Sequence, residues 1–294
     1  MADAEPLSQV GERGVAAQQN LDVVHAATVS PWNNRRVLIL LPPSEGKTAP
    51  RRGAPLDLGS LYLPELAPAR QAVLDALIEV SGRDDAARQL KVTPGLADLV
   101  HRNTSLKDAA TARAEKVYTG VLYDALDTAA LDAAARRRAN RRVLIFSALF
   151  GALRLSDRIP AYRLSGSVSL PGFGPVSTYW RGQLQDAIDG RGLVVDCRSS
   201  AYAAMWQPQT DRHLPVRVFR EADGVRSVIS HMAKHSRGLV ARALCEESSE
   251  PKRPSDLVDL LNGYFAGHDV FTATGAPVAV KVELGDGTID VITT

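Results

Sequence analysis

The stretch "VLILLPPSEGKTAPRRG", Val37–Gly53, begins as an apolar run and passes into a turn that contains two prolines. A short apolar run bounded by turn residues is typical of a strand buried in a sheet. The turn includes Gly46-Lys47-Thr48, which matches the end of the phosphate-binding motif G-x-x-x-x-G-K-[ST]. However, Leu41 replaces the first glycine of that motif, and the prolines remove amide donors that phosphates would need. We therefore interpret the stretch as a strand end that presents polar side chains rather than as a nucleotide-binding P-loop.

Further apolar runs follow the first and predict the other strands of a sheet. They are "RVLIFSALFG" at Arg142–Gly151, "GLVVDCRSS" at Gly192–Ser200 and "RSVISHMA" at Arg226–Ala233. In "LPVRVFREADGVRSVIS", Asp223-Gly224 separates two strand-like runs, which is a strong signal for a β-hairpin.

Helical segments alternate with these strands. "APARQAVLDALIEVSG" closes on Gly82, a helix-stop signal, and "SLKDAATARAEKVYTGVLYDALD" is also interpreted as helical. A third helix is predicted in "KHSRGLVARALCEES". The pattern predicts a single mixed α/β domain over residues 36–294, with a central sheet flanked by helices, after a poorly ordered extension at residues 1–35.

Composition and motifs exclude several classes of protein. The chain has 294 residues, 45% hydrophobic and 23% charged, with a net charge of +2, as in an ordinary soluble globule. Cys197 and Cys245 are too far apart for a zinc motif, and the histidines His231 and His235 lack an accompanying carboxylate. No signal peptide, membrane span, or motif for flavin, nicotinamide or haem is recognised, so we expect a cytoplasmic protein without metal or organic cofactor.

Polar side chains follow each apolar run, where ligands of α/β sheets usually bind. The candidates are Ser44, Glu45, Lys47 and Thr48 after the first run, Ser147, Arg154, Asp157, Tyr162 and Arg163 after the second, Ser199 and Tyr202 after the third, and Lys234 and Arg237 after the fourth. If the strand ends adjoin, these residues form one cleft. Taken singly, Arg154 and Asp157 could instead be a surface helix pair, and Tyr162 and Arg163 could only anchor a loop.

The cationic run "AAARRRANRR", Ala133–Arg142, has two interpretations. It is a solvated helix face just before a strand, which we favour, or it is a patch that contacts phosphates.

Several motifs resemble those of the YaaA family, the peroxide stress proteins of bacteria. They are the turn with Lys47-Thr48, "VYTGVLYDAL" at Val117–Leu126, "SALFGALRLSDRIPAYRL" at Ser147–Leu164, "YWRGQL" at Tyr179–Leu184, "VVDCRSSAYAAMW" at Val194–Trp206 and "AKHSRGLVAR" at Ala233–Arg242. The resemblance implies an α/β domain with a positively charged cleft, protection against peroxide, and binding of double-stranded DNA through a helix-hairpin-helix-like element. The nearest candidate for that element is "LKVTPGLADLVHRN", Leu90–Asn103.

Two hypotheses of function follow. In the first, the protein is an oxidoreductase that uses hydrogen peroxide to N-hydroxylate the exocyclic amine of a purine-like substrate. Lys47 or Tyr162 would donate a proton and Glu45 or Asp157 would accept one. The substrate would be bound by Ser44, Thr48, Tyr118, Thr119, Ser147, Arg154, Arg163, Ser199, Tyr202, Lys234 and Arg237. In the second, the protein binds DNA without catalysis and shields it from oxidation, with affinity that falls steeply with salt.

Overall fold

The structure, a computed structural model, describes residues 37–208, 212–228 and 233–294. The predicted extension at residues 1–35 lies outside the described residues. Residues 229–232, which include His231 and belong to the fourth predicted strand, also lie outside them.

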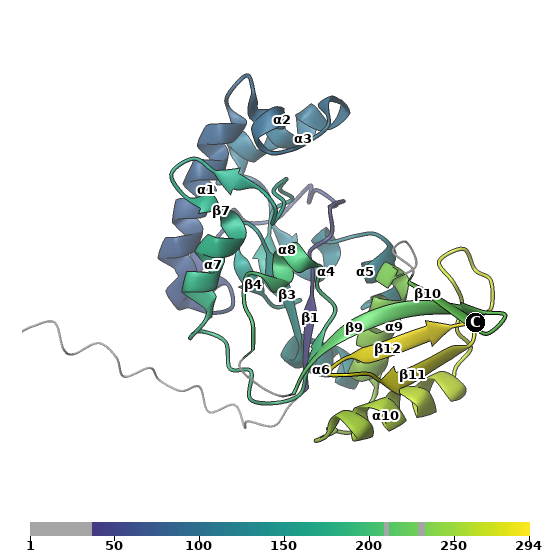
Figure 1. Ribbon diagram of the computed structural model, residues 1–294. Coiled ribbons are helices and arrows are strands. Elements are labelled where there is room, and N and C mark those ends of the chain that lie inside the picture. The colour runs from purple at the N-terminus through teal and green to yellow at the C-terminus, as the bar shows by residue number, and fades with distance from the viewer. Residues whose placement is uncertain (1–36, 209–211, 229–232) are drawn as a thin grey trace, which may run out of the picture. The chain divides into compact units, whose positions relative to one another are not determined.

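The centre of the fold is an eight-stranded sheet built around the quoted stretch (Figure 1). Strand β1, Leu38–Leu41, lies parallel to β3, Val143–Ser147, on one side and to β8, Val194–Asp196, on the other. All the residues of β3 and β8 are buried, as expected for parallel strands covered on both faces. The mixed α/β fold with a central sheet and flanking helices is therefore confirmed.

Strand β9, His213–Ala222, extends the sheet beyond β8. Its first residues pair with β8, and its later ones pair with β12, Ile289–Thr293, and β10, Val225–Val228. Strands β4, Gly151–Leu153, and β11, Val280–Leu284, are antiparallel to their neighbours β3 and β12. The full order is β11-β12-β9-β8-β1-β3-β4, with β10 beside β9.

The predicted hairpin at Asp223-Gly224 is confirmed. Ala222 of β9 faces Val225 of β10 across the two-residue turn. Both turn residues have positive φ, 52° for Asp223 and 74° for Gly224, as a type I′ turn requires.

The predicted helix before Gly82 is confirmed as α1, Ala67–Ser81, and the helix predicted after the hairpin is α9, Ala233–Glu246. The other longer helices are α6, Ala133–Arg142, α7, Val176–Leu184, and α10, Pro254–Ala266. Figure 1 shows α7 near β4 at one end of the sheet and α10 along β11 at the other. Within the described residues, no helix is long and apolar enough to cross a membrane.

Short elements complete the fold. The short helices are α2, Ala86–Gln89, α3, Ala97–His101, α4, Ala114–Val117, α5, Val121–Leu126, and α8, Ser200–Ala203. The short strands are β2, Ala112–Arg113, β5, Arg158–Ile159, β6, Ser169–Leu170, and β7, Gly174–Pro175. Single 3₁₀ turns occupy Leu58–Ser60, Pro64–Leu66, Pro94–Leu96 and Arg102–Ser105.

The predicted helical segment 105–127 is only partly helical. It holds β2, α4 and α5, and the chain leaves the helical conformation between Tyr118 and Gly120. Gly120 has φ 99°, which few other residues adopt, and Tyr118 pairs instead with Lys47. Tertiary pairing with the turn after β1 therefore overrides the local helix signal.

Candidate functional site

The turn after β1 is held against the segment between α4 and α5. Lys47 and Tyr118 form a short antiparallel bridge, and the Thr48 amide donates to the Val117 carbonyl over 2.9 Å. The Ser44 hydroxyl accepts from the Thr119 amide at 3.0 Å. The turn after β1 was predicted to present polar residues. These contacts hold it against a segment that is far away in the sequence.

The Lys47 side chain is half-buried between two tyrosine rings. Its ammonium nitrogen donates to the Ser44 carbonyl at 2.6 Å and lies 4.4 Å from the ring centre of Tyr162 and 5.5 Å from that of Tyr118. Burial, together with the nearby charge of Arg163, lowers the pKa of Lys47 from 10.5 to about 7, although Glu45 opposes the shift. At neutral pH this amine can therefore either donate or accept a proton.

Buried hydroxyl groups continue from Lys47 to the end of β3. The Tyr162 hydroxyl lies 2.7 Å from the hydroxyl of Ser147, the last residue of β3, and 3.0 Å from that of Tyr118. Ser147 also accepts from the Phe150 amide at 3.1 Å. Burial raises the pKa of both tyrosines, so their phenols stay protonated. The second strand end thus supplies a chain of neutral proton donors beside the amine.

Arg163 and Glu45 form an ion pair at the rim of this group. The guanidinium of Arg163 lies 2.9 Å from the Glu45 carboxylate, whose side chain is 72% exposed, whereas that of Arg163 is 15% exposed. The Arg163 amide donates to the side chain of Asn103 at 2.8 Å. An exposed pair of this kind contributes little stability, but it places a cation close to Lys47 and a carboxylate within reach of solvent.

Tyr202 brings the third strand end to the same place. It lies on α8 just after β8, and its hydroxyl accepts from the Gly166 amide at 3.2 Å. Burial raises the pKa of Tyr202, and the charges of Glu45 and Arg163 act on the same phenol. Ser199 is the residue that precedes α8, and it is exposed.

A buried network of Asp196, Arg198 and His213, whose pairing the sequence did not reveal, supports Tyr202. Arg198 binds the Asp196 carboxylate through two nitrogens, at 2.9 and 2.7 Å, and donates to the Tyr202 carbonyl at 3.1 Å. His213 Nε2 lies 2.9 Å from the same carboxylate. Burial alone would raise the pKa of Asp196, but the hydrogen bonds from Arg198 and His213 outweigh it and the pKa falls below its usual range. The spacing Asp-x-Arg at the end of a strand is the signal that could have indicated this pair.

The structure does not bring Arg154 and Asp157 to the group around Lys47, and a role for either of them in a site stays a prediction. The Arg154 guanidinium donates to the Arg141 and Val143 carbonyls at 2.8 and 3.0 Å. Asp157 accepts from the Arg154 amide at 3.0 Å. Val143 begins β3 and Ser147 ends it, so this cluster lies at the opposite end of the strand. The cause is the antiparallel return of β4, which carries the chain back toward the start of β3.

Two predicted site residues, Lys234 and Arg237, lie on α9. The Arg237 guanidinium donates to the Val216 carbonyl at 3.0 Å, and its own carbonyl lies 3.9 Å from the sulfur of Cys197, just after β8. Lys234 is exposed in the first turn of α9. A role for either residue in binding a substrate stays a prediction.

The segment Leu90–Asn103 contains the short helix α3 and follows the short helix α2, with Pro94–Leu96 between them. Lys91 on the connecting turn donates to the Ser167 carbonyl at 2.9 Å. DNA binding by this segment stays a prediction, and so does a positively charged cleft at the strand ends. Among the described residues, no three His, Cys, Asp or Glu side chains are grouped so that they could hold a metal ion.

Comparison with known proteins places the chain among bacterial relatives. The family model described as peroxide stress protein YaaA matches residues 37–267, which include every predicted site residue. A UPF0246 protein of Streptomyces coelicolor is 45% identical over 256 residues, which are 84% of this chain and 98% of that protein. A UPF0246 protein of Corynebacterium efficiens is 40% identical over 233 residues, 77% of this chain and 92% of that protein.

Proposed function

The chain belongs to the YaaA family of peroxide stress proteins, and from this premise we propose that it uses hydrogen peroxide to N-hydroxylate the exocyclic amine of a purine-like compound. The family's link to peroxide supports the choice of oxidant. The observation that carries the proposal is the amine of Lys47, held between the rings of Tyr118 and Tyr162 with its pKa lowered to about 7. A donor of this kind is matched to proton transfer at neutral pH.

The proposed reaction converts an amine R–NH₂ and H₂O₂ into R–NHOH and water. The amine nitrogen attacks one peroxide oxygen, so an N–O bond forms while the O–O bond breaks. The second oxygen leaves with the bonding electron pair and takes up a proton, which makes it water. The nitrogen loses one proton and is oxidised by two electrons, and the peroxide is reduced by the same two electrons.

Each step has a candidate group near Lys47. Hydroxide is a poor leaving group, so protonated Lys47 would donate to the departing oxygen, with the Tyr162 hydroxyl as the nearest further donor. Arg163 would stabilise the negative charge that develops on that oxygen. Glu45, exposed at the rim, would take the proton from the amine. Asp157 is no longer a candidate base, because it lies at the other end of β3.

The test is the variant Lys47→Met, which keeps much of the side-chain length and removes the charge. We expect a loss on the order of 100-fold or more in peroxide-dependent conversion of adenine to a product one oxygen heavier, measured by mass spectrometry. The matched control is Lys116→Met on α4, because Lys116 is an exposed lysine close in sequence to Tyr118. Thermal unfolding of both variants shows whether the fold is kept.

Two outcomes would contradict the proposal. Conversion by Lys47→Met at the rate of the unmodified protein would remove Lys47 from the mechanism. A lack of any product from the unmodified protein, together with binding of duplex DNA that weakens steeply between two salt concentrations, would favour the non-catalytic DNA-binding alternative.

A further inference from the structure

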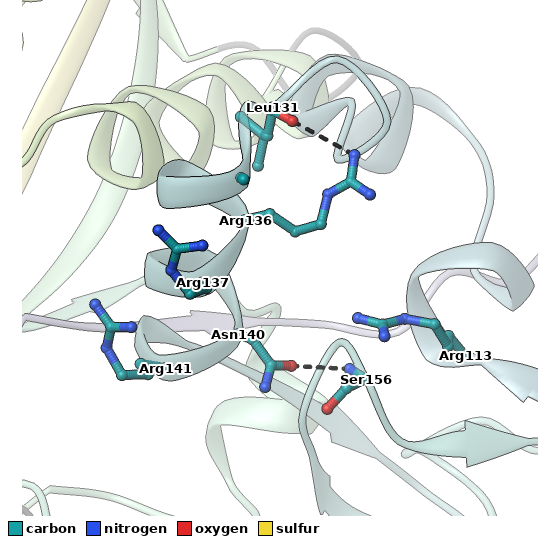
Figure 2. A pocket seen from close by; sticks show the side chains of 8 residues that line it. Arg113, Leu131, Arg136, Arg137, Asn140, Arg141 and Ser156 are labelled. Atoms are coloured by element: carbon teal, nitrogen blue, oxygen red, sulfur yellow. Dashed lines mark hydrogen bonds between the residues drawn. The ribbon is translucent and has the colours of Figure 1, made fainter.

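A hollow of about 640 Å³ lies beside α6, away from the Lys47 site (Figure 2). Its walls carry four arginines, Arg113, Arg136, Arg137 and Arg141, together with Asn140 and Ser156. Arg141 lies two residues before the first residue of β3, whereas the Lys47 group gathers at the other end of that strand. The hollow is therefore a separate place on the molecule, and its volume is in the range of small-molecule sites.

The arginines of α6 divide between two faces of the helix. Arg138 and Arg142 turn inward and donate to carbonyls at the C-terminal end of α9, including that of Cys245, 2.9 Å from Arg138. These two have a structural role. Arg136 and Arg137 are exposed and line the hollow, with Asn140 and Arg141 one turn further along. One face of the run is therefore packed against α9, which the sequence did not predict, and the two interpretations, a solvated face or a patch that contacts phosphates, concern the other face.

The contacts at the hollow leave donors available to a ligand. Arg136 donates to the Ala129 carbonyl at 3.1 Å through one terminal nitrogen, which holds it at the rim. The Arg137 side chain makes no hydrogen bond or ion pair with any residue that the structure describes, although the charge of Asp132 at the start of α6 acts on it. The side-chain oxygen of Asn140 accepts from the Ser156 amide at 3.0 Å, so the NH₂ group of Asn140 takes no part in this bond.

Charge at the hollow is poorly balanced. Of the side chains that line it in the described part of the chain, none is acidic, although Arg113 is paired from outside with Glu115 at 2.6 Å. Figure 2 shows Arg113 on the wall opposite Arg136 and Arg137, so cations approach the hollow from two sides. Like charges on one helix face repel each other, and a bound anion would remove that cost.

We propose that this hollow binds a compact polyanion that carries two or more phosphate groups, through Arg113, Arg136, Arg137 and Asn140. Guanidinium groups bind phosphate oxygens in pairs with strong, charge-assisted hydrogen bonds, and several of them facing one space suit a ligand with several phosphates. A nucleoside triphosphate and an inorganic polyphosphate share this chemistry. Long duplex DNA is the less suitable ligand, because these cations gather around one hollow of about 640 Å³ rather than along an extended surface.

The test is calorimetric titration of the full chain with sodium tripolyphosphate at about 100 mM salt, where long-range attraction is screened. We expect saturable binding at one site, with at least about 10-fold weaker binding of orthophosphate. Arg136→Gln with Arg137→Gln should weaken tripolyphosphate binding on the order of 100-fold, because two charge-assisted contacts are lost. The control Arg83→Gln with Arg88→Gln removes the same charge from exposed sites and should leave the affinity unchanged.

Further arms identify the source of the ligand and separate this proposal from the Lys47 chemistry. Equal affinity for ATP and tripolyphosphate would show that the protein recognises the phosphates alone. Tighter binding of ATP would show that the protein also contacts the nucleoside. Lys47→Met should bind tripolyphosphate as the unmodified protein does. The proposal is overturned if tripolyphosphate shows no saturable binding, or if the two double variants lose equal affinity for it. It is also overturned if the Arg136→Gln, Arg137→Gln variant loses affinity for duplex DNA but binds tripolyphosphate as tightly as the unmodified protein.

Discussion

At the scale of single residues, the lowered pKa of Lys47 links the stability of the protein to pH. The unfolded chain holds this proton up to about pH 10.5, whereas the folded protein releases it near pH 7. Between these values the unfolded state binds more protons, so the free energy of unfolding contributed by Lys47 rises with pH. Below pH 7 both states are protonated, and the full cost of burying the charge is present.

We therefore expect the unmodified protein to gain stability relative to Lys47→Met as the pH rises from 7 to 9, by no more than about 1.4 kcal/mol per pH unit. Urea unfolding of the two proteins at pH 6, 7, 8 and 9 measures this difference. A gap between them that stays constant over that range would show that the amine keeps its ordinary pKa.

The sequence alone predicts which residues lie together in the site only where they end a strand or belong to the turn that follows it. Lys47 and Ser147 were identified because each lies at or just after the end of a parallel strand, and those ends adjoin in the sheet. Arg154 lies away from this group because the chain reverses into β4, and that reversal is set by tertiary pairing and has no strong local signal. The pairing of Asp196 with Arg198 was not predicted, because its role is to position Tyr202.

At the scale of elements, α5 and α9 approach each other closely at Gly238. A Cβ atom added there would lie 2.3 Å from the Leu122 carbonyl oxygen and 2.7 Å from the Ala125 methyl carbon. The substitution Gly238→Ala should therefore destabilise the protein by about 1–3 kcal/mol, since the backbone of α5 must move. Chemical denaturation measures the change.

Gly263 of α10 is the matched control, because an added Cβ atom there meets nothing within 4 Å. Alanine has the higher helix propensity, so Gly263→Ala should stabilise the protein by up to about 1 kcal/mol. Opposite signs for the two variants would confirm that close helix packing, rather than propensity, fixes the residue at 238.

The elements differ in how far their sequence predicts them. Strand β1 and the hairpin at Asp223-Gly224 carry local signals, an apolar run and a turn that requires positive φ, and both were predicted. Strands β11 and β12 were not among the predicted strands. Strand β12 depends on pairing with β9, a strand far earlier in the chain, and β11 pairs in turn with β12. Strand β11 is also half exposed and weakly apolar.

At the scale of the whole molecule, the last strand belongs to the core although it lies beyond the residues matched by the family model. All five residues of β12 are buried between β9 and β11. Deletion of residues 289–294 would expose both neighbours and remove Ile289, Val291 and Ile292 from the interior. Each such side chain contributes about 1.5–3 kcal/mol when buried, so the loss approaches the stability of a typical domain.

We expect the deletion to lower the yield of soluble protein and the temperature of unfolding sharply. Removal of the exposed Thr294 alone should have little effect. An unchanged unfolding temperature after the longer deletion would show that β12 is dispensable.

The central place of β1 has a consequence for the order in which the protein is made. Ile39 pairs with Val143, and Leu38 pairs with Val194, so the strand emerges from the ribosome long before either partner exists. Parallel pairings between distant segments form slowly, and an unpaired apolar strand is prone to aggregate in the meantime. The nascent chain must therefore carry this largely buried strand without a partner until β3 has been made, and without its second partner until β8 has been made.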